Sequence, residues 1–141
     1  MAGNNFFFGA TLNDRNTDIG LLLLRILAGL SLMFGHGLGK LPPSEGFVSM
    51  VGDLGLPAPG FAAWLSTLAE FGGGILLVLG LLTRPTAVLI IINMLVAAFM
   101  AHAGESFGER EKALLFAFIA LLYLIAGAGR YSLDARIGNR S

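Results

Sequence analysis

Four polar side chains interrupt long apolar runs of this sequence, namely those of Arg25, His36, Glu70 and Asn93. An ionised side chain at the centre of a membrane-spanning helix costs about 3 kcal/mol, so such residues are rare and commonly take part in function. A buried carboxylate near a cation can bind or exchange protons. Glu70 is therefore the first candidate for chemistry.

The depth of these residues predicts which of them meet. Counted at 1.5 Å per residue from the ends of the apolar runs, Arg25 and Glu70 differ in level by only about 7 Å, within reach of a long Arg side chain. We expect an Arg25–Glu70 ion pair with Asn93 as a hydrogen-bonding neighbour, because pairing compensates the desolvation of both charges. The alternative is that this pair only sets the register of the helices.

One face of the first apolar run is polar at both ends. Arg25, Gly29, Leu32, His36 and Lys40 follow one another in steps of three or four residues, which places them on one stripe of a helix. We expect this stripe to face the interior of the protein.

Glycines surround His36 and recur at residues 72–74. Gly35 and Gly39 form a GxxxG pair, which predicts close packing against a neighbouring helix. Gly37 and the run 72–74 remove further side-chain bulk. The alternative is that this space admits a flat ligand beside His36.

The two histidines, His36 and His102, lie at the same ends of two runs that are expected to cross in the same direction. Three ligands are conceivable: a haem held by both rings, a metal ion held by histidines and carboxylates, or a quinone headgroup in an acid–base pocket. Nothing in the sequence shows that both rings can reach one iron, and no His-x-x-x-His or Glu-x-x-His pattern exists, so haem and metal are disfavoured. Histidine titrates near neutral pH, which favours a proton-exchanging pocket, although plain helix-end polarity also accounts for His102.

We therefore predict an outward-facing polar pocket that binds a quinone. Its expected catalytic residues are Glu70 and His36. Its expected binding residues are Arg25, His36, Lys40, Glu70, His102 and Glu111. No metal ligand is expected.

The composition excludes several classes of protein. Of the 141 residues, 55% are hydrophobic and 13% are charged, whereas a soluble domain carries roughly a quarter charged residues. Nine basic residues balance nine acidic ones, which argues against nucleic acid as a partner because phosphate binding needs a concentrated basic face. The absence of cysteine removes disulfides, dithiol exchange and iron–sulfur clusters, so any redox role needs a bound cofactor.

Hydropathy predicts an all-α polytopic membrane protein, a four-helix bundle with up-down topology in a single domain over residues 1–141. The expected spans are residues 19–38, 61–82, 85–103 and 111–128, between flexible tails 1–16 and 135–141. Their lengths approach the roughly 20 residues that a helix needs to cross a bilayer. Four crossings put both termini on one side, and the excess of Arg and Lys on that side favours the cytoplasm.

A short amphipathic helix is expected between the first two spans. Apolar residues at 47, 48, 50, 51 and 54 have helical spacing, which is typical of a segment that lies on the membrane surface. It is interpreted as a connection that fills the interface or, alternatively, as a lid over an outward-facing site.

The chain resembles the DoxX family of small bacterial membrane proteins. The resemblance rests on six segments that occur in order: residues 22–25, 36–40, 55–57, 69–73, 80–84 and 129–134. It implies a four-helix inner-membrane protein described as an oxidoreductase component, with relatives that act as the quinone-linked subunit of thiosulfate oxidation. By position, the recurring polar residues of the family correspond to Arg25, His36, Lys40, Glu70 and Arg130.

Two functions remain open. The first is a quinone-linked oxidoreductase component in which Glu70 and His36 exchange protons and a partner subunit supplies electrons. The second is a non-enzymatic accessory subunit of a larger membrane complex. A small-solute carrier is a third option, to which only a faint similarity between residues 33–37 and 99–103 points. The expected partners are the bilayer and either membrane or redox subunits or a second copy of the chain.

Overall fold

The computed structural model describes residues 14–138, and this part of the chain is helical without any strand, which confirms the predicted all-α class. The elements are α1 (Asp14–Leu32), η1 (Met33–Gly37), η2 (Leu38–Lys40), α2 (Glu45–Asp53), α3 (Pro59–Thr67), η3 (Leu68–Gly72), α4 (Gly73–Leu79), α5 (Thr83–Val96), η4 (Ala97–Ala101), α6 (Phe107–Ala126) and α7 (Leu133–Gly138). Of these, η1, η3 and η4 are π-helical turns and η2 is a 3₁₀ turn.

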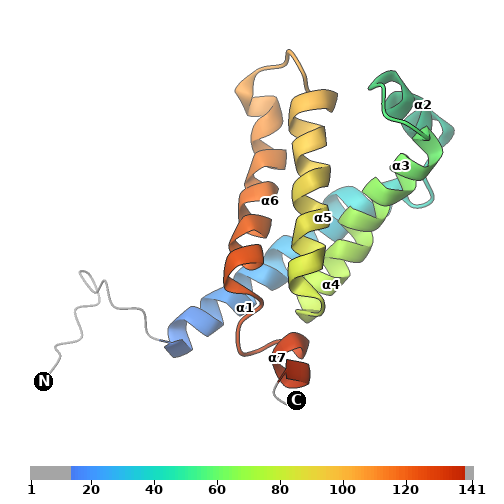
Figure 1. Ribbon diagram of the computed structural model, residues 1–141. Coiled ribbons are helices and arrows are strands. Elements are labelled where there is room, and N and C mark those ends of the chain that lie inside the picture. The colour runs from blue at the N-terminus through green and yellow to red at the C-terminus, as the bar shows by residue number, and fades with distance from the viewer. Residues whose placement is uncertain (1–13, 139–141) are drawn as a thin grey trace, which may run out of the picture.

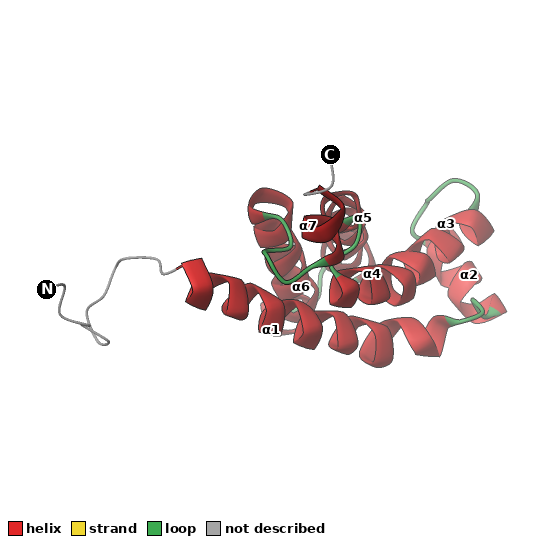
Figure 2. Cartoon of the chain, turned by 90° about the horizontal axis from the view of Figure 1, so that it is seen from below, coloured by secondary structure: helices red, strands yellow, loops and turns green. Residues whose placement is uncertain are grey.

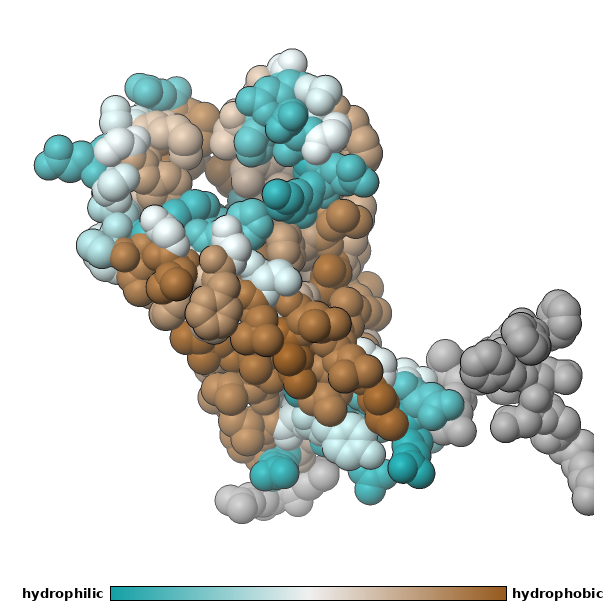
Figure 3. Space-filling model, turned by 180° about the vertical axis from the view of Figure 1, so that it is seen from behind, coloured by the Kyte–Doolittle hydropathy of each residue, from teal (hydrophilic) through white to brown (hydrophobic). Residues whose placement is uncertain are grey.

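Three continuous helical stretches are long and apolar enough to cross a membrane. They are Asp14–Lys40, Pro59–Leu79 and Thr83–Ala101. Each contains one of the π-helical turns and coincides with one of the first three predicted spans to within five residues at either end. The space-filling view shows the same character, with a broad apolar belt between polar ends (Figure 3).

The fourth predicted span is helical, but its composition differs from that of the others. Helix α6 begins at Phe107, and its first turns carry Glu109, Arg110, Glu111 and Lys112. The apolar remainder, residues 113–126, is only about 21 Å long at 1.5 Å per residue, against about 30 Å of hydrocarbon. The crossing by α6, and with it the four-helix up-down bundle, therefore stays a prediction.

The long helices form two side-by-side pairs. Helix α5 packs along α6, and α1 packs along α4, with the α1–α4 pair inclined to the α5–α6 pair (Figures 1 and 2). The buried core joins both pairs and contains many alanines, such as Ala28, Ala87 and Ala117, beside larger side chains such as Leu77 and Met94. Small residues let helix backbones approach closely in a membrane, where apolar side chains gain little by leaving lipid.

Glycine makes the α1–α4 contact possible, but not at the predicted pair. A Cβ on Gly29 would lie 2.6 Å from the carbonyl oxygen of Gly74, and one on Gly37 would lie 2.5 Å from the backbone nitrogen of Phe71. Nothing lies within 4 Å of a Cβ on Gly35 or Gly39, so the expectation that these two residues mediate close packing is wrong. They are separated by one turn, but the face that they share points away from α4.

Arg25 connects α1 to the segment that follows α6. Its side chain is 1% exposed and donates from Nη1 to the carbonyl of Ala128 at 2.9 Å and from Nη2 to that of Tyr131 at 2.8 Å. Gly80 lies beside the guanidinium with φ of +63°, and a Cβ there would overlap Arg25 Nη1. Glycine is required at this turn for two reasons: it adopts the left-handed backbone conformation without strain, and it leaves room for the guanidinium of Arg25.

Helix α7 is held against the turn between α4 and α5. The carboxylate of Asp134 accepts hydrogen bonds from the backbone N–H groups of Leu82 at 2.8 Å and Thr83 at 2.9 Å, which caps the start of α5. Burial alone would raise the pKa of Asp134, but these two donors and the charge of Arg25 outweigh it and hold the pKa below its ordinary value.

The described part of each predicted flexible tail is helical. Residues 14–16 already belong to α1, and residues 135–138 belong to α7, whose attachment through Asp134 orders them. The remaining tail residues, 1–13 and 139–141, lie outside the described residues.

We expect Gly29→Ala to destabilise the protein, because the new methyl group would push α1 away from Gly74. Overpacking of this kind costs about 1 to 3 kcal/mol. Thermal unfolding of the purified protein in detergent measures the loss. Gly35→Ala is the matched control on the same helical stretch and should leave the unfolding midpoint unchanged or raised; equal losses in both variants would contradict the packing described above.

Asp134→Ala should remove the cap of α5 and lower the free energy of unfolding by about 1 kcal/mol at neutral pH. Because the folded-state pKa of Asp134 is depressed, its contribution is complete above about pH 4 and is lost as the pH falls through the folded pKa. Unfolding curves of both proteins from pH 7 to pH 3 should therefore converge at the acidic end. Asp53→Ala, at an exposed position on α2, makes the same change of charge and should show no such convergence.

Candidate functional site

Three helical stretches bring Lys40, Glu70 and Asn93 together. Glu70 is 3% exposed and lies in the middle of the π-helical turn η3. Its Oε1 accepts a hydrogen bond from Lys40 Nζ at 2.8 Å and another from Asn93 Nδ2 at 3.0 Å, and its Oε2 also lies 2.8 Å from Lys40 Nζ. The cation and the amide thus compensate a carboxylate that would be costly among apolar helices.

The predicted partner of Glu70 was wrong, while the predicted contact with Asn93 is confirmed. Aligning the ends of the predicted spans places Glu70 opposite Gly29, but the packed register places it near Gly37, about two helical turns away. Arg25 lies twelve residues before Gly37, or about 18 Å along the helix, and binds backbone carbonyls instead. The apolar boundaries do not reveal this register, because contacts between backbones decide it.

The π-helical turns shape the surroundings of this ion pair. Turn η1, which contains His36, packs against η3, which contains Glu70. A π-helical turn inserts an extra residue into an α-helix and is frequent at functional sites. Here two such turns face each other at the level of the buried carboxylate.

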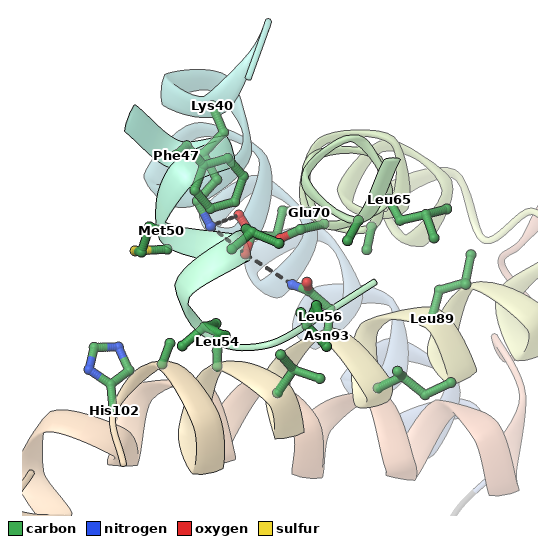
Figure 4. Close-up of a pocket in the computed structure, with 18 of the residues that line it drawn as sticks. Lys40, Phe47, Met50, Leu54, Leu56, Leu65, Glu70, Leu89, Asn93 and His102 are labelled. Atoms are coloured by element: carbon green, nitrogen blue, oxygen red, sulfur yellow. Dashed lines mark hydrogen bonds and ion pairs between the residues drawn. The ribbon is translucent and has the colours of Figure 1, made fainter. Parts of the chain in front are cut away.

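A cavity of about 660 Å³ opens next to Glu70 (Figure 4). Its polar lining includes Lys40, Glu70, Asn93 and Ser66, with His102 and Glu105 also on its wall. The rest is apolar and comes from α2, the segment after α2, α3, η3, α5 and η4: Phe47, Met50, Val51, Leu54, Leu56, Ala62, Leu65, Ala69, Leu89, Ile92, Val96, Ala97 and Ala101. The volume and the apolar walls are typical of a site for a small organic ligand.

Helix α2 forms one wall of this cavity. Its existence confirms the predicted short helix, which begins after the N-cap Ser44, whose hydroxyl accepts a hydrogen bond from the N–H of Phe47 at 3.2 Å. The ammonium group of Lys40 lies 5.1 Å from the centre of the Phe47 ring. A cation over an aromatic face is an attractive contact, so the ion pair and the helix support each other.

The segment that carries Lys40 is held in place by Thr67. The buried hydroxyl of Thr67 donates a bifurcated hydrogen bond to the carbonyl oxygens of Lys40, at 3.2 Å, and Ala63, at 2.9 Å. The end of the first helical stretch is thereby tied to α3. This contact fixes the backbone position from which the Lys40 side chain reaches Glu70.

Only some of the predicted site residues meet. Lys40, Glu70 and His102 line the cavity, whereas Arg25, His36 and Glu111 do not. Arg25 lies at the other end of the molecule.

His36 and Glu111 lie apart from the cavity, whereas His102 lies on its wall. The ring of His36 contacts that of Phe116 edge to face, with 5.5 Å between the centres, and Glu111 is exposed on α6. His102 Nδ1 lies 2.7 Å from Glu105 Oε2, in a pair that is open to solvent. Among the described residues, no three His, Cys, Asp or Glu side chains gather as metal ligands would.

Sequence reasoning missed the cavity-lining role of most apolar residues. Phe47, Met50 and Leu54 lie on the apolar face of a helix that could equally rest on lipid, so only the lid alternative pointed to them. Leu65 and Leu89 carry no signal that separates a cavity wall from a lipid-facing side chain. Lys40 was a candidate, but its partner could not be identified before the register was known.

Comparison with known proteins agrees with this architecture. The chain matches the DoxX family over residues 20–103. It is 34% identical to the inner membrane protein YqjF of Escherichia coli over 127 residues, which cover 87% of this chain and 95% of that protein. No solved structure matches it significantly.

Two further relatives have similar coverage. The inner membrane protein YphA of Escherichia coli is 34% identical, over 82% of this chain and 89% of that protein. A protein of Bacillus subtilis named "Putative oxidoreductase CatD" is 31% identical, over 86% of this chain and 89% of its own length. With the family match covering more than half of its length and with its apolar helices, this chain is a membrane protein that belongs to the DoxX family.

Proposed function

We propose that this protein is a quinone-binding component of a bacterial inner-membrane oxidoreductase. The observation that carries the proposal is the cavity beside Glu70, in which apolar walls surround a buried ion pair. Two relatives are named inner membrane proteins and one is named as an oxidoreductase, which supports the location and the general activity.

The cavity has the properties that a quinone requires. Its volume of about 660 Å³ lies within the range of small-molecule sites, and its apolar lining suits a ring with a hydrocarbon chain. The polar residues Lys40, Glu70 and Asn93 are grouped together, so they can orient the oxygen-bearing end of the ring.

The ligand would enter from the bilayer. Leu65, Leu89 and Ile92 line the cavity and are 45%, 53% and 56% exposed, so their outer surfaces would contact lipid in a membrane. An apolar rim of this kind admits molecules dissolved in the hydrocarbon more readily than ions from water.

A bound quinone would supply a carrier of two electrons and two protons. In this proposal Glu70 exchanges a proton with the ring, and Lys40 compensates the charge of its carboxylate. His36, which the sequence suggested as the second proton carrier, lies on η1 outside the cavity wall. The chain has no cysteine, so the electrons would come from a partner subunit.

The proposed topology has four crossings with both termini in the cytoplasm. Arg15, Arg84, Arg130, Arg136 and Arg140 would then face the cytoplasm, in agreement with the preference of short cytoplasmic loops for basic residues. Helix α6 would reach the outer interface with its charged first turns in the headgroup region, where such side chains stay hydrated.

The quinone proposal predicts that the purified protein retains quinone. Protein extracted from native membranes in mild detergent should carry quinone that mass spectrometry detects after solvent extraction. Leu89→Trp should reduce the amount per protein several-fold, because the larger ring fills the lipid-facing rim of the cavity. Leu23→Trp is the control, since Leu23 is an exposed apolar residue on α1 that does not line the cavity.

Two results would count against this function. One is the absence of quinone together with stable co-purification of partner chains, which would favour an accessory subunit. The other is an equal quinone content in both tryptophan variants and the wild type, which would place the quinone elsewhere.

The topology is tested with reporter fusions in an intact bacterium. A fluorescent protein fused after Ser141 should fluoresce, and alkaline phosphatase fused there should be inactive, because both report a cytoplasmic end. Alkaline phosphatase inserted after Gly104, in the exposed turn between η4 and α6, should be active. Activity of the phosphatase at the C-terminus would exclude the proposed orientation.

A further inference from the structure

The cavity beside Glu70 extends from the buried ion pair to a solvent-exposed turn. His102 and Glu105 line it and belong to the turn between η4 and α6, where their paired side chains are open to solvent. The side chain of Lys40 is 31% exposed, so solvent also comes close to the cation that Glu70 binds. Polar groups that water can hydrate are therefore present both at the mouth of the cavity and at its floor.

The mouth of the cavity lies opposite to the two ends of the described chain. Helix α1 starts beside the segment that leads into α7, where the N–H of Arg130 donates to Asp18 at 2.9 Å. Helix α2 and the turn between η4 and α6 lie at the other end of the molecule (Figure 1). We call the two faces of the membrane the terminal side and the turn side. The cavity opens toward the turn side.

An apolar layer separates Glu70 from the terminal side. It is formed by runs that contain no polar side chain, residues 71–79, 87–92 and 113–122. Residues 26–35 of the first stretch contain only Ser31, which is exposed on the surface. From Asn93 to Thr86, the next polar residue along α5, the layer is about 10 Å thick at 1.5 Å per residue. A buried water needs roughly two to four polar partners, so this layer offers no place for a chain of waters that carries protons.

The other titratable groups near Glu70 also lead to the turn side. The ring of His36 is within electrostatic range of Glu70, Lys40 and Lys112. Lys112 is exposed in the first turns of α6, which begins at the end of the same turn that carries the cavity mouth. A proton route through His36 would thus end on the same side of the membrane as the cavity.

We propose that the cavity is an aqueous inlet that opens on the turn side only, so that protons reach the Lys40–Glu70 pair from that side of the membrane and not from the terminal side. This inference rests on the proposed function for the proton exchange at Glu70, and it adds the compartment that takes part, which is the outer one in the proposed topology. The apolar layer beneath Glu70 stops water and ions, because a charge in an apolar interior is very costly. The protein would therefore exchange protons with one compartment without conducting them across the membrane.

Single cysteines test whether water reaches the inlet, because the natural chain contains no cysteine. Ser66→Cys and Ala97→Cys place a thiol on the cavity wall, one helical turn from Glu70 and Asn93 respectively. The full-length variants stay in membrane vesicles of known orientation and are treated with sulfonatoethyl methanethiosulfonate, a charged reagent that does not cross the bilayer. We expect both thiols to react at least about tenfold faster from the turn side, because the charge keeps the reagent out of the apolar layer.

Three further variants provide the controls. Ala103→Cys, in the exposed turn after η4, reports the turn side, and Thr17→Cys, in the exposed first turns of α1, reports the terminal side. Ser31→Cys makes the same substitution as Ser66→Cys at an exposed position outside the cavity, where lipid would surround the thiol. It should react from neither side.

The same thiols report where the protons come from. The thiolate is the reactive form, so the rate of reaction with membrane-permeant N-ethylmaleimide follows the pH at the cysteine. In vesicles with a pH gradient, raising the pH by one unit on the turn side, within the range below the pKa of the thiol, should increase the rate for Ala97→Cys by about tenfold. The same change on the terminal side should leave the rate unchanged.

The outcomes separate this inference from the function on which it rests. Reaction of the cavity thiols from the turn side, at a rate that follows the pH of that side, supports the inlet. Reaction from neither side, from both sides, or at a rate that follows the pH of the terminal side overturns it and leaves quinone binding intact. Quinone extraction tests the ligand separately, so a chain that reacts as expected but carries no quinone keeps the inlet and loses the proposed ligand. If one cavity variant does not fold, the other decides the question.

Discussion

The buried carboxylate of Glu70 is the constraint on which the rest of the site depends. A carboxylate among apolar helices needs a compensating charge and hydrogen-bond donors, and Lys40 and Asn93 provide them from two other helical stretches. These contacts tie the end of the first stretch to the middle of the other two. The cavity lies directly beside that point, so the group that organises the helices is also the group that a ligand would meet.

Close backbone contacts at glycines decide which residues can reach Glu70. Gly29 and Gly37 allow the first helical stretch to lie against Gly74 and Phe71, and this register brings Lys40 to the carboxylate. The π-helical turns at the same level adjust the direction of the side chains that they carry. Close packing and the polar site are therefore consequences of one arrangement.

The molecule has two polar centres with different roles. Arg25 donates to carbonyls of the segment between α6 and α7, where Asp134 also caps α5, so this centre closes one end of the fold. The centre at Glu70 instead borders an open cavity. Two buried charges of opposite sign in neighbouring helices thus belong to separate sites, although their depths estimated from hydropathy suggested a pair.

Hydropathy, helical spacing and loop residues were enough to predict an all-α membrane protein, three of its long helices, the short helix α2 and the burial of Glu70, because these properties depend on each segment and its immediate neighbours. The partner of Glu70, the cavity and the separation of His36 and Glu111 from it required the tertiary structure. Their positions depend on the register and inclination of packed helices. A shift of two turns leaves the apolar pattern of each helix acceptable but changes every contact between helices.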